Sequence, residues 1–151
     1  MNVVASAAQL ASIPGRPKLL ALNFFPSFYP PRSGGEQRSF HVLEALSRHY
    51  HVLSMTPTYA GTRDEIVHFS PSFEEWRFAK TAAYQQWHAE FKSQNIAAGG
   101  ADLAMALAVQ RHRTYIAAVR QHWSDSDVIL IQHPCALPAI SGLDRTGKRI
   151  V

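Results

Sequence analysis

The stretch that decides the fold is "KLLALNFFPSFYPPRSGGEQRSFHVLEALSRHYHVLSMTP", residues 18–57. Its first seven residues form a short apolar run bounded by prolines, which is typical of a buried strand. Prolines and glycines then exclude regular structure as far as Gly35. From Glu36 onward apolar residues recur three or four positions apart, which predicts a helix, and residues 51–57 predict a second strand. The order strand, loop, helix, strand is the opening of an α/β domain.

Three further strands are predicted outside this stretch. Residues 65–71, "EIVHFSP", indicate a weaker strand, and residues 148–151, "KRIV", indicate the beginning of another. Residues 127–133, "DVILIQH", are the clearest case, because a nearly continuous apolar run is expected of a parallel strand buried on both faces. Strands separated by helices imply crossover connections and a mainly parallel sheet with helices on both faces. The sequence therefore predicts a Rossmann-like, doubly wound α/β fold.

Two long helical regions are predicted in the middle of the chain. The first covers residues 72–92, with one face marked by Phe73, Trp76, Tyr84, Trp87 and Phe91. That face is either core or, since Lys80 and Lys92 flank it, a membrane-surface helix. Gly99 and Gly100 end this region. Asp102 is then the expected N-cap of a helix of about 20 residues, whose stripe is Met105, Val109, His112, Ile116, Val119 and Trp123.

The composition is that of a globular domain. The chain has 151 residues, of which 46% are hydrophobic and 17% charged, and this balance excludes intrinsic disorder. No apolar run approaches the roughly 20 residues that span a bilayer. Residues 1–17 lack the charged start and long apolar centre of a signal peptide and are expected to form a flexible leader. The single cysteine, Cys135, excludes an internal disulfide framework and fits a reducing cytoplasm.

The net charge is compatible with several classes of binding partner. Lys and Arg outnumber Asp and Glu by 15 to 11, a net charge of +4 that suits a phosphate-bearing ligand, an anionic membrane surface or simply a solvated basic face. The excess is too small and too scattered to indicate nucleic-acid binding. A peripheral contact with the inner face of a membrane remains one interpretation.

The loop before the first predicted helix is a candidate anion site. It follows the first strand, where doubly wound folds bind ligands, and Gly34 and Gly35 stand at the helix start, where free N–H groups and the helix dipole favour phosphate. Arg38 carries a positive charge that the dipole disfavours there, so a nearby anion, a salt bridge or solvent must account for it. The dinucleotide and Walker A glycine patterns are both absent. A purely structural turn is the alternative interpretation.

Two segments together resemble the amino-terminal domain of family 4 glycosyltransferases of the GT-B fold. The first is "NFFPSFYPPRSGGEQRSFHVLEALSRHYHVLSMTP" and the second is "SDVILIQHPCALPAI", followed by a "GK-x-[IV]-V" strand. The resemblance covers most of residues 18–151, which it identifies as an acceptor-side Rossmann-like domain, whereas residues 58–125 carry no family signature. His133 ends the clearest predicted strand, at the carboxyl edge where such sheets build their sites. The resemblance implies that it lies in the active-site cleft near the transferred sugar.

The resemblance also implies the reaction and the partners. A sugar would pass from a nucleotide-diphosphate sugar to a hydroxyl acceptor, such as a glycan, a lipid-linked or a small molecule, with retention of configuration. Gly34, Gly35 and Arg38 would bind substrate, and no cofactor or metal of the domain's own is expected. The donor nucleotide would be held by a carboxyl-terminal Rossmann-like domain, which is expected in the full protein. Residues 18–151 are therefore expected to be an incomplete half of the enzyme, inactive alone, and cytoplasmic.

The remaining histidines and the cysteine receive structural interpretations. His112 is expected to be a satisfied core histidine, and Cys135 a buried, inert thiol. No His-x-x-x-His pair exists, so a zinc hydrolase is not indicated. Two alternatives to the transferase stay open at this point. One is a non-catalytic Rossmann-like binding or regulatory module, and the other is a nucleotide-dependent enzyme with an atypical glycine loop.

Overall fold

The computed structural model describes residues 15–31, 33–93 and 106–151 and shows an α/β fold with a six-stranded, mostly parallel sheet. The elements in chain order are β1 (Lys18–Leu22), α1 (Gly34–Leu46), β2 (His51–Tyr59), β3 (Glu65–Ser70), β4 (Phe73–Ala79), α2 (Ala82–Ser93), α4 (Arg113–Trp123), β5 (Val128–Ile131), the 3₁₀ helix η1 (Pro134–Ile140) and β6 (Arg149–Ile150). The strand order is β3-β4-β2-β1-β5-β6, and the predicted Rossmann-like fold class is confirmed.

The centre of the sheet is parallel. β1 pairs with β2 on one side and with β5 on the other, so that Leu20 lies opposite both Leu53 and Ile129. β3 is antiparallel to β4 and forms one edge of the sheet. The register between β2 and β4 shifts between Thr56 and Tyr59, across Pro57, because a proline cannot donate to the ladder.

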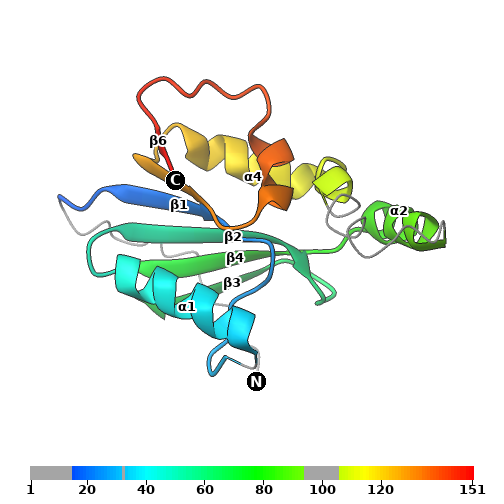
Figure 1. Ribbon diagram of the computed structural model, residues 1–151, viewed down its shortest axis with the longest axis horizontal. Helices are drawn as coiled ribbons and strands as arrows, with labels where there is room; N and C mark the ends of the chain where they lie inside the picture. The colour runs from blue at the N-terminus through cyan, green and yellow to red at the C-terminus, as the bar shows by residue number, and fades with distance from the viewer. Residues whose placement is uncertain (1–14, 32, 94–105) are drawn as a thin grey trace.

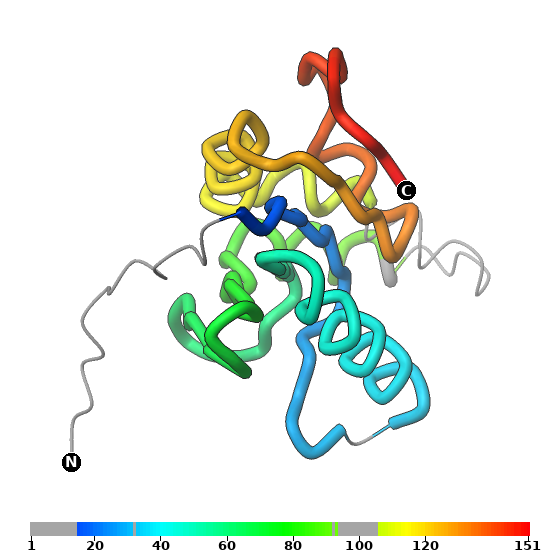
Figure 2. Tube along the Cα trace, turned by 90° about the vertical axis from the view of Figure 1, so that its left-hand side faces the viewer, coloured from blue at the N-terminus to red at the C-terminus, as the bar shows by residue number. Residues whose placement is uncertain are grey.

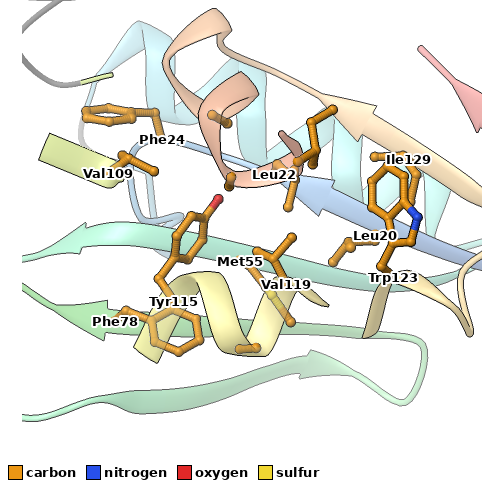
Figure 3. Close-up of a cluster of buried hydrophobic side chains, with 14 of the residues drawn as sticks. Leu20, Leu22, Phe24, Met55, Phe78, Val109, Tyr115, Val119, Trp123 and Ile129 are labelled. Carbon is orange, nitrogen blue, oxygen red and sulfur yellow. The ribbon is translucent and has the colours of Figure 1, made fainter. Parts of the chain in front are cut away.

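Helices cover both faces of the sheet, α1 on one side and α4 with η1 on the other (Figure 1). Successive side chains of β1 point to opposite faces, as the pleat of a strand requires. Leu19 therefore packs with Phe40 and Leu43 of α1, whereas Leu20 packs in the larger cluster with Val119 and Trp123 of α4. Figure 3 shows this larger cluster around Leu20, Met55, Val119, Trp123 and Ile129. The buried residues of α4 recur at helical spacing: Tyr115, Ala118, Val119 and Trp123.

Most of the predicted strands and the first predicted helix are confirmed. The strands at 51–57, 65–71, 127–133 and 148–151 correspond to β2, β3, β5 and β6, with ends that differ by a few residues. The predicted helix from Glu36 corresponds to α1, which begins two residues earlier, at Gly34. Not every apolar residue of α1 faces the sheet, since Val42 is 42% exposed and lies outside the buried clusters.

The prediction of one helix over residues 72–92 is wrong for its first part. Residues 73–79 form β4, which pairs with β2 and β3, and the helix α2 begins only at Ala82. Phe73 and Trp76 are three residues apart, which fits a helical stripe, but here they belong to a strand. The proposed aromatic face of a single membrane-surface helix is therefore not formed. Tyr84 is buried, and the ring of Trp87 packs on Phe91 and under the guanidinium of Arg111.

The prediction of one helix from Asp102 to Trp123 is also wrong. Asp102 and Met105 lie outside the described residues, but residues 106–109 are helical, residues 110–112 are not, and α4 starts at Arg113. The interruption coincides with His112, whose buried ring binds the Ala79 carbonyl oxygen at 3.0 Å. The helix is thus interrupted where His112 makes a tertiary contact with the end of β4. In the part of the chain that the structure describes, no helix is long and apolar enough to cross a membrane.

Candidate functional site

A cleft of about 930 Å³ opens at the carboxyl ends of β1 and β5, beside the amino-terminal half of α1. The described part of the loop that leaves β1 bows away from the sheet on its way to α1 (Figure 2). Such an edge is where doubly wound sheets bind ligands. This space is called the cleft below, and the residues that line it are Asn23, Phe24, Phe25, Pro26, Phe28, Ser33, Gly35, Glu36, Arg38, Ser39, Val42, Thr58, Tyr59, Ala60, Leu130, Ile131, Gln132 and His133.

Three of the four sequence-predicted site residues line this cleft. Gly35 and Arg38 lie on α1, and His133 lies between β5 and η1. Gly34 is the first residue of α1 and is not among the lining residues. Segments that lie far apart in the sequence are thus brought together by the parallel pairing of β1 with β5.

The start of α1 carries its own cap. The Ser33 hydroxyl accepts a hydrogen bond from the backbone N–H of Glu36 at 3.3 Å, and Glu36 supplies the negative charge that the first turn favours. By helix geometry, the first N–H groups have no partner within the helix. A Cβ atom added at Gly34 or Gly35 would meet nothing within 4 Å, and neither residue has a positive φ. The two glycines are therefore not required by the fold, and at Gly35, which lines the cleft, the lack of a side chain leaves the backbone accessible.

His133 is held in one orientation. Its Nδ1 accepts a hydrogen bond from the backbone N–H of Cys135 at 3.3 Å, which makes His133 the N-cap of η1. In the neutral ring the proton therefore lies on Nε2. The ring packs against Phe24 and Phe25, with centroid distances of 5.6 and 6.4 Å. His133 thus brings one N–H donor to the cleft beside aromatic rings.

A buried ion pair anchors the loop that borders the cleft. Glu75 of β4 is 0% exposed, and its carboxylate accepts the backbone N–H of Ser27 at 2.9 and 3.1 Å. It also accepts from Arg77 Nε at 2.9 Å and from the Ser54 hydroxyl at 3.3 Å. Arg77 in turn donates to the Ser27 carbonyl oxygen and to Glu65. Burial raises the pKa of Glu75, and the hydrogen bonds from Arg77 and Ser27 act against that rise.

The same arginine supports two aromatic residues that line the cleft. Its guanidinium lies 4.9 Å from the centre of the Phe28 ring and 5.7 Å from that of Tyr59. A side-chain hydrogen bond with Glu65 is the main cause that raises the pKa of Tyr59. The anchor network, Ser27, Glu75, Arg77 and Glu65, therefore fixes part of the aromatic wall. Sequence reasoning missed it because residues 73–79 are interpreted there as helix.

Three polar side chains of the cleft were also missed. Asn23 follows β1, Gln132 follows β5, and Ser39 of α1 lies between them. Asn23 Nδ2 donates to Ser39 Oγ at 2.8 Å, and Ser39 Oγ donates to Gln132 Oε1 at 2.8 Å. The signal was available, since a polar residue directly after a buried parallel strand lies at the ligand edge, which is the reasoning that selects His133.

The interpretation of His112 as a satisfied core histidine is confirmed, and so is the burial of Cys135, whereas the inertness of its thiol stays a prediction. His112 is 0% exposed, its Nε2 donates to the Ala79 carbonyl oxygen, and its Nδ1 lies 3.2 Å from the Thr114 hydroxyl. Burial lowers the pKa of His112. Cys135 is buried in the core cluster beside η1.

Comparisons with known proteins give one distant likeness. No protein-family model matches the chain, and no curated protein matches it. Among solved structures, a chain described as sucrose-phosphate synthase from Thermosynechococcus elongatus is similar in outline, with 11% sequence identity and a TM-score of 0.30. The match covers 90% of this chain and 87% of that chain.

Proposed function

We propose that this chain forms the acceptor side of a GT-B glycosyltransferase, which transfers a sugar from a nucleotide-diphosphate sugar to a hydroxyl group. The observation that carries the proposal is that Gly35, Arg38 and His133 line one cleft at the carboxyl edge of the sheet. The resemblance of the two sequence segments around these residues selects this reaction among those that such an edge supports.

The start of α1 is suited to the leaving diphosphate. Negative charge develops on the diphosphate as its bond to the sugar breaks, and a helix amino terminus with a nearby arginine stabilises such charge. Gly35 leaves space for a close approach of the ligand to the backbone, since a Cβ there would meet nothing within 4 Å. Arg38 is exposed at the same border of the cleft and adds a full positive charge.

His133 is proposed to contact the reacting sugar. Its Nδ1 is occupied by the Cys135 N–H, so its Nε2–H is the group that can donate to a sugar hydroxyl or to a phosphate oxygen. In the proposed enzyme a second Rossmann-like domain holds the nucleotide, and the configuration at the transferred carbon is retained. Both statements follow from the family resemblance.

The test uses the full-length protein with a panel of nucleotide-diphosphate sugars and hydroxyl acceptors. We expect His133→Ala to lower turnover roughly 100-fold or more, the size of effect typical for a positioned side chain at the reacting centre. The matched control is His68→Ala on β3, which removes an exposed imidazole that pairs with Glu74 outside the cleft.

The outcomes separate the proposal from its alternatives. Equal turnover by wild type and His133→Ala, with both proteins folded, would remove His133 from the site. Binding of nucleotide-sugars without transfer in the full-length protein would indicate a non-catalytic binding module instead. Circular dichroism and thermal unfolding of both variants establish that any loss is not caused by misfolding.

A further inference from the structure

The cleft holds a hydrogen-bonded chain of three side chains that the proposed reaction does not yet use. Asn23, Ser39 and Gln132 come from the ends of two neighbouring parallel strands and from α1, and we call them the amide relay. The two hydrogen bonds at Ser39 Oγ are each 2.8 Å long. All three residues line the cleft, and Asn23 is only 5% exposed. The relay is therefore part of the packed wall of the cleft and not a contact between exposed surface side chains.

The chemistry of Ser39 determines what the relay offers to a ligand. A hydroxyl has a single proton, so Ser39 must accept from one amide and donate to the other. Whichever way the two amides are turned, one amide keeps a spare carbonyl oxygen and the other a spare NH₂ group. Among the described residues, no hydrogen bond uses Asn23 Oδ1 or Gln132 Nε2. The relay therefore keeps one acceptor and one donor for a ligand, on two residues that both line the cleft.

The residues around the amide relay narrow the chemical class of the ligand further. His133 directly follows Gln132 and adds its Nε2–H donor, while Phe25, 55% exposed, and the rings of Phe28 and Tyr59 supply apolar faces. A sugar ring matches this mixture, because each hydroxyl both donates and accepts and because its C–H face packs on aromatic rings. A purely apolar chain would leave the two amides without hydrogen-bond partners, which disfavours its binding.

We propose that the acceptor is a carbohydrate, and that Asn23 and Gln132 bind two neighbouring hydroxyls of its terminal ring. Ser39 is a positioning residue, because its single hydroxyl proton requires that one amide donates to it while the other accepts from it. This inference rests on the proposed function and names the acceptor class of the same cleft. It requires no bond to be made or broken by the relay.

The test measures binding of simple acceptor probes without any nucleotide donor. The full chain is titrated with methyl glycosides of glucose, galactose and mannose, followed by ligand-observed NMR. Tetrahydropyran, which lacks the hydroxyls, and adenine, which offers a flat base to the same amides but has no sugar ring, are the comparison probes. We expect at least one glycoside to bind, and neither comparison probe to depend on Gln132.

Variants assign that binding to the relay. Gln132→Leu and Ser39→Ala are each expected to weaken glycoside binding roughly tenfold, as loss of about one to two hydrogen bonds predicts. Ser39→Thr keeps the hydroxyl and should restore binding, which a merely structural role would not require. Ser126→Ala is the matched control, because it removes a buried serine hydroxyl that donates to the His122 carbonyl oxygen at 2.8 Å.

Two results would overturn the inference. One is that the folded wild type binds no glycoside, and the other is that glycoside binding is unchanged in both Gln132→Leu and Ser39→Ala. The proposed function fails separately: wild type that binds a glycoside through the relay yet transfers no sugar refutes only the transferase. Conversely, transfer to an acceptor without a sugar ring, at a rate that Gln132→Leu does not alter, refutes only the carbohydrate acceptor.

Discussion

Replacing Glu75 by alanine removes the acceptor at the centre of the anchor network. The side chain accepts hydrogen bonds from the Ser27 N–H, the Ser54 hydroxyl and Arg77 Nε, and it is 0% exposed. Arg77 would keep Glu65 and the Ser27 carbonyl oxygen but lose its buried counter-charge. Removing one partner of a buried ion pair costs about 3–5 kcal/mol. Since whole domains are stable by roughly 5–15 kcal/mol, the variant should be marginal.

The assay is urea unfolding of the full chain, followed by tryptophan fluorescence and circular dichroism. Ser54→Ala is the matched control, because it removes a single 3.3 Å hydrogen bond to the same carboxylate and should cost only about 1 kcal/mol. A double-mutant cycle with Arg77→Ala isolates the pair, and we expect a coupling energy of about 2 kcal/mol.

Either of two measurements would contradict this role of the Glu75–Arg77 ion pair. One is a loss below about 1 kcal/mol for Glu75→Ala, which would place its cost at the level of the single neutral hydrogen bond. The other is a coupling energy below about 0.5 kcal/mol, the size found for independent sites. Glu75→Gln, which keeps the shape, should fall between wild type and the alanine variant, because its amide can still accept from Ser27.

Three further predictions concern the site and the core. Gly35→Ala should stabilise the helix by up to about 1 kcal/mol. In the proposed reaction it should also raise the KM for the nucleotide-sugar, because the new methyl group enters the open side of the cleft, and an unchanged KM would contradict the approach of a ligand there. Ser33→Ala should cost about 1 kcal/mol through loss of the helix cap, measured by urea unfolding, and a neutral result would exclude the cap. Burial lowers the pKa of His112 in the folded chain, so the unfolded chain takes up the proton at a higher pH and the free energy of unfolding should fall as the pH drops below about 6.5. His112→Gln should flatten this part of the plot of unfolding free energy against pH. Burial also lowers the pKa of His122, so the variant should keep part of the pH dependence.

The core of the fold was predictable because its signals are local. The apolar runs of β1 and β5 and the 3.6-residue period of α1 are each complete within a dozen residues, and each points to one element type. Their parallel order follows from strands separated by a helix. The same logic placed His133 at the ligand edge of the sheet.

The middle of the chain was not predictable because its structure depends on distant partners. β4 contains two buried charges, Glu75 and Arg77, which no strand pattern anticipates and which are tolerated only because they pair with each other and with Ser27. The helical interpretation of Phe73 and Trp76 used spacing alone. The break before α4 likewise depends on the bond from His112 to the Ala79 carbonyl oxygen, two residues 33 positions apart.

The two faces of α1 have a consequence for protein engineering. Phe40 and Leu43 are buried against the sheet, whereas Gly35, Arg38 and Val42 line the cleft from the opposite side and lie outside the buried clusters. A combinatorial library at these three positions would therefore vary ligand preference with little risk to folding. Natural adaptation to a new ligand can proceed by the same separable steps, because one helix face changes while the other preserves the domain.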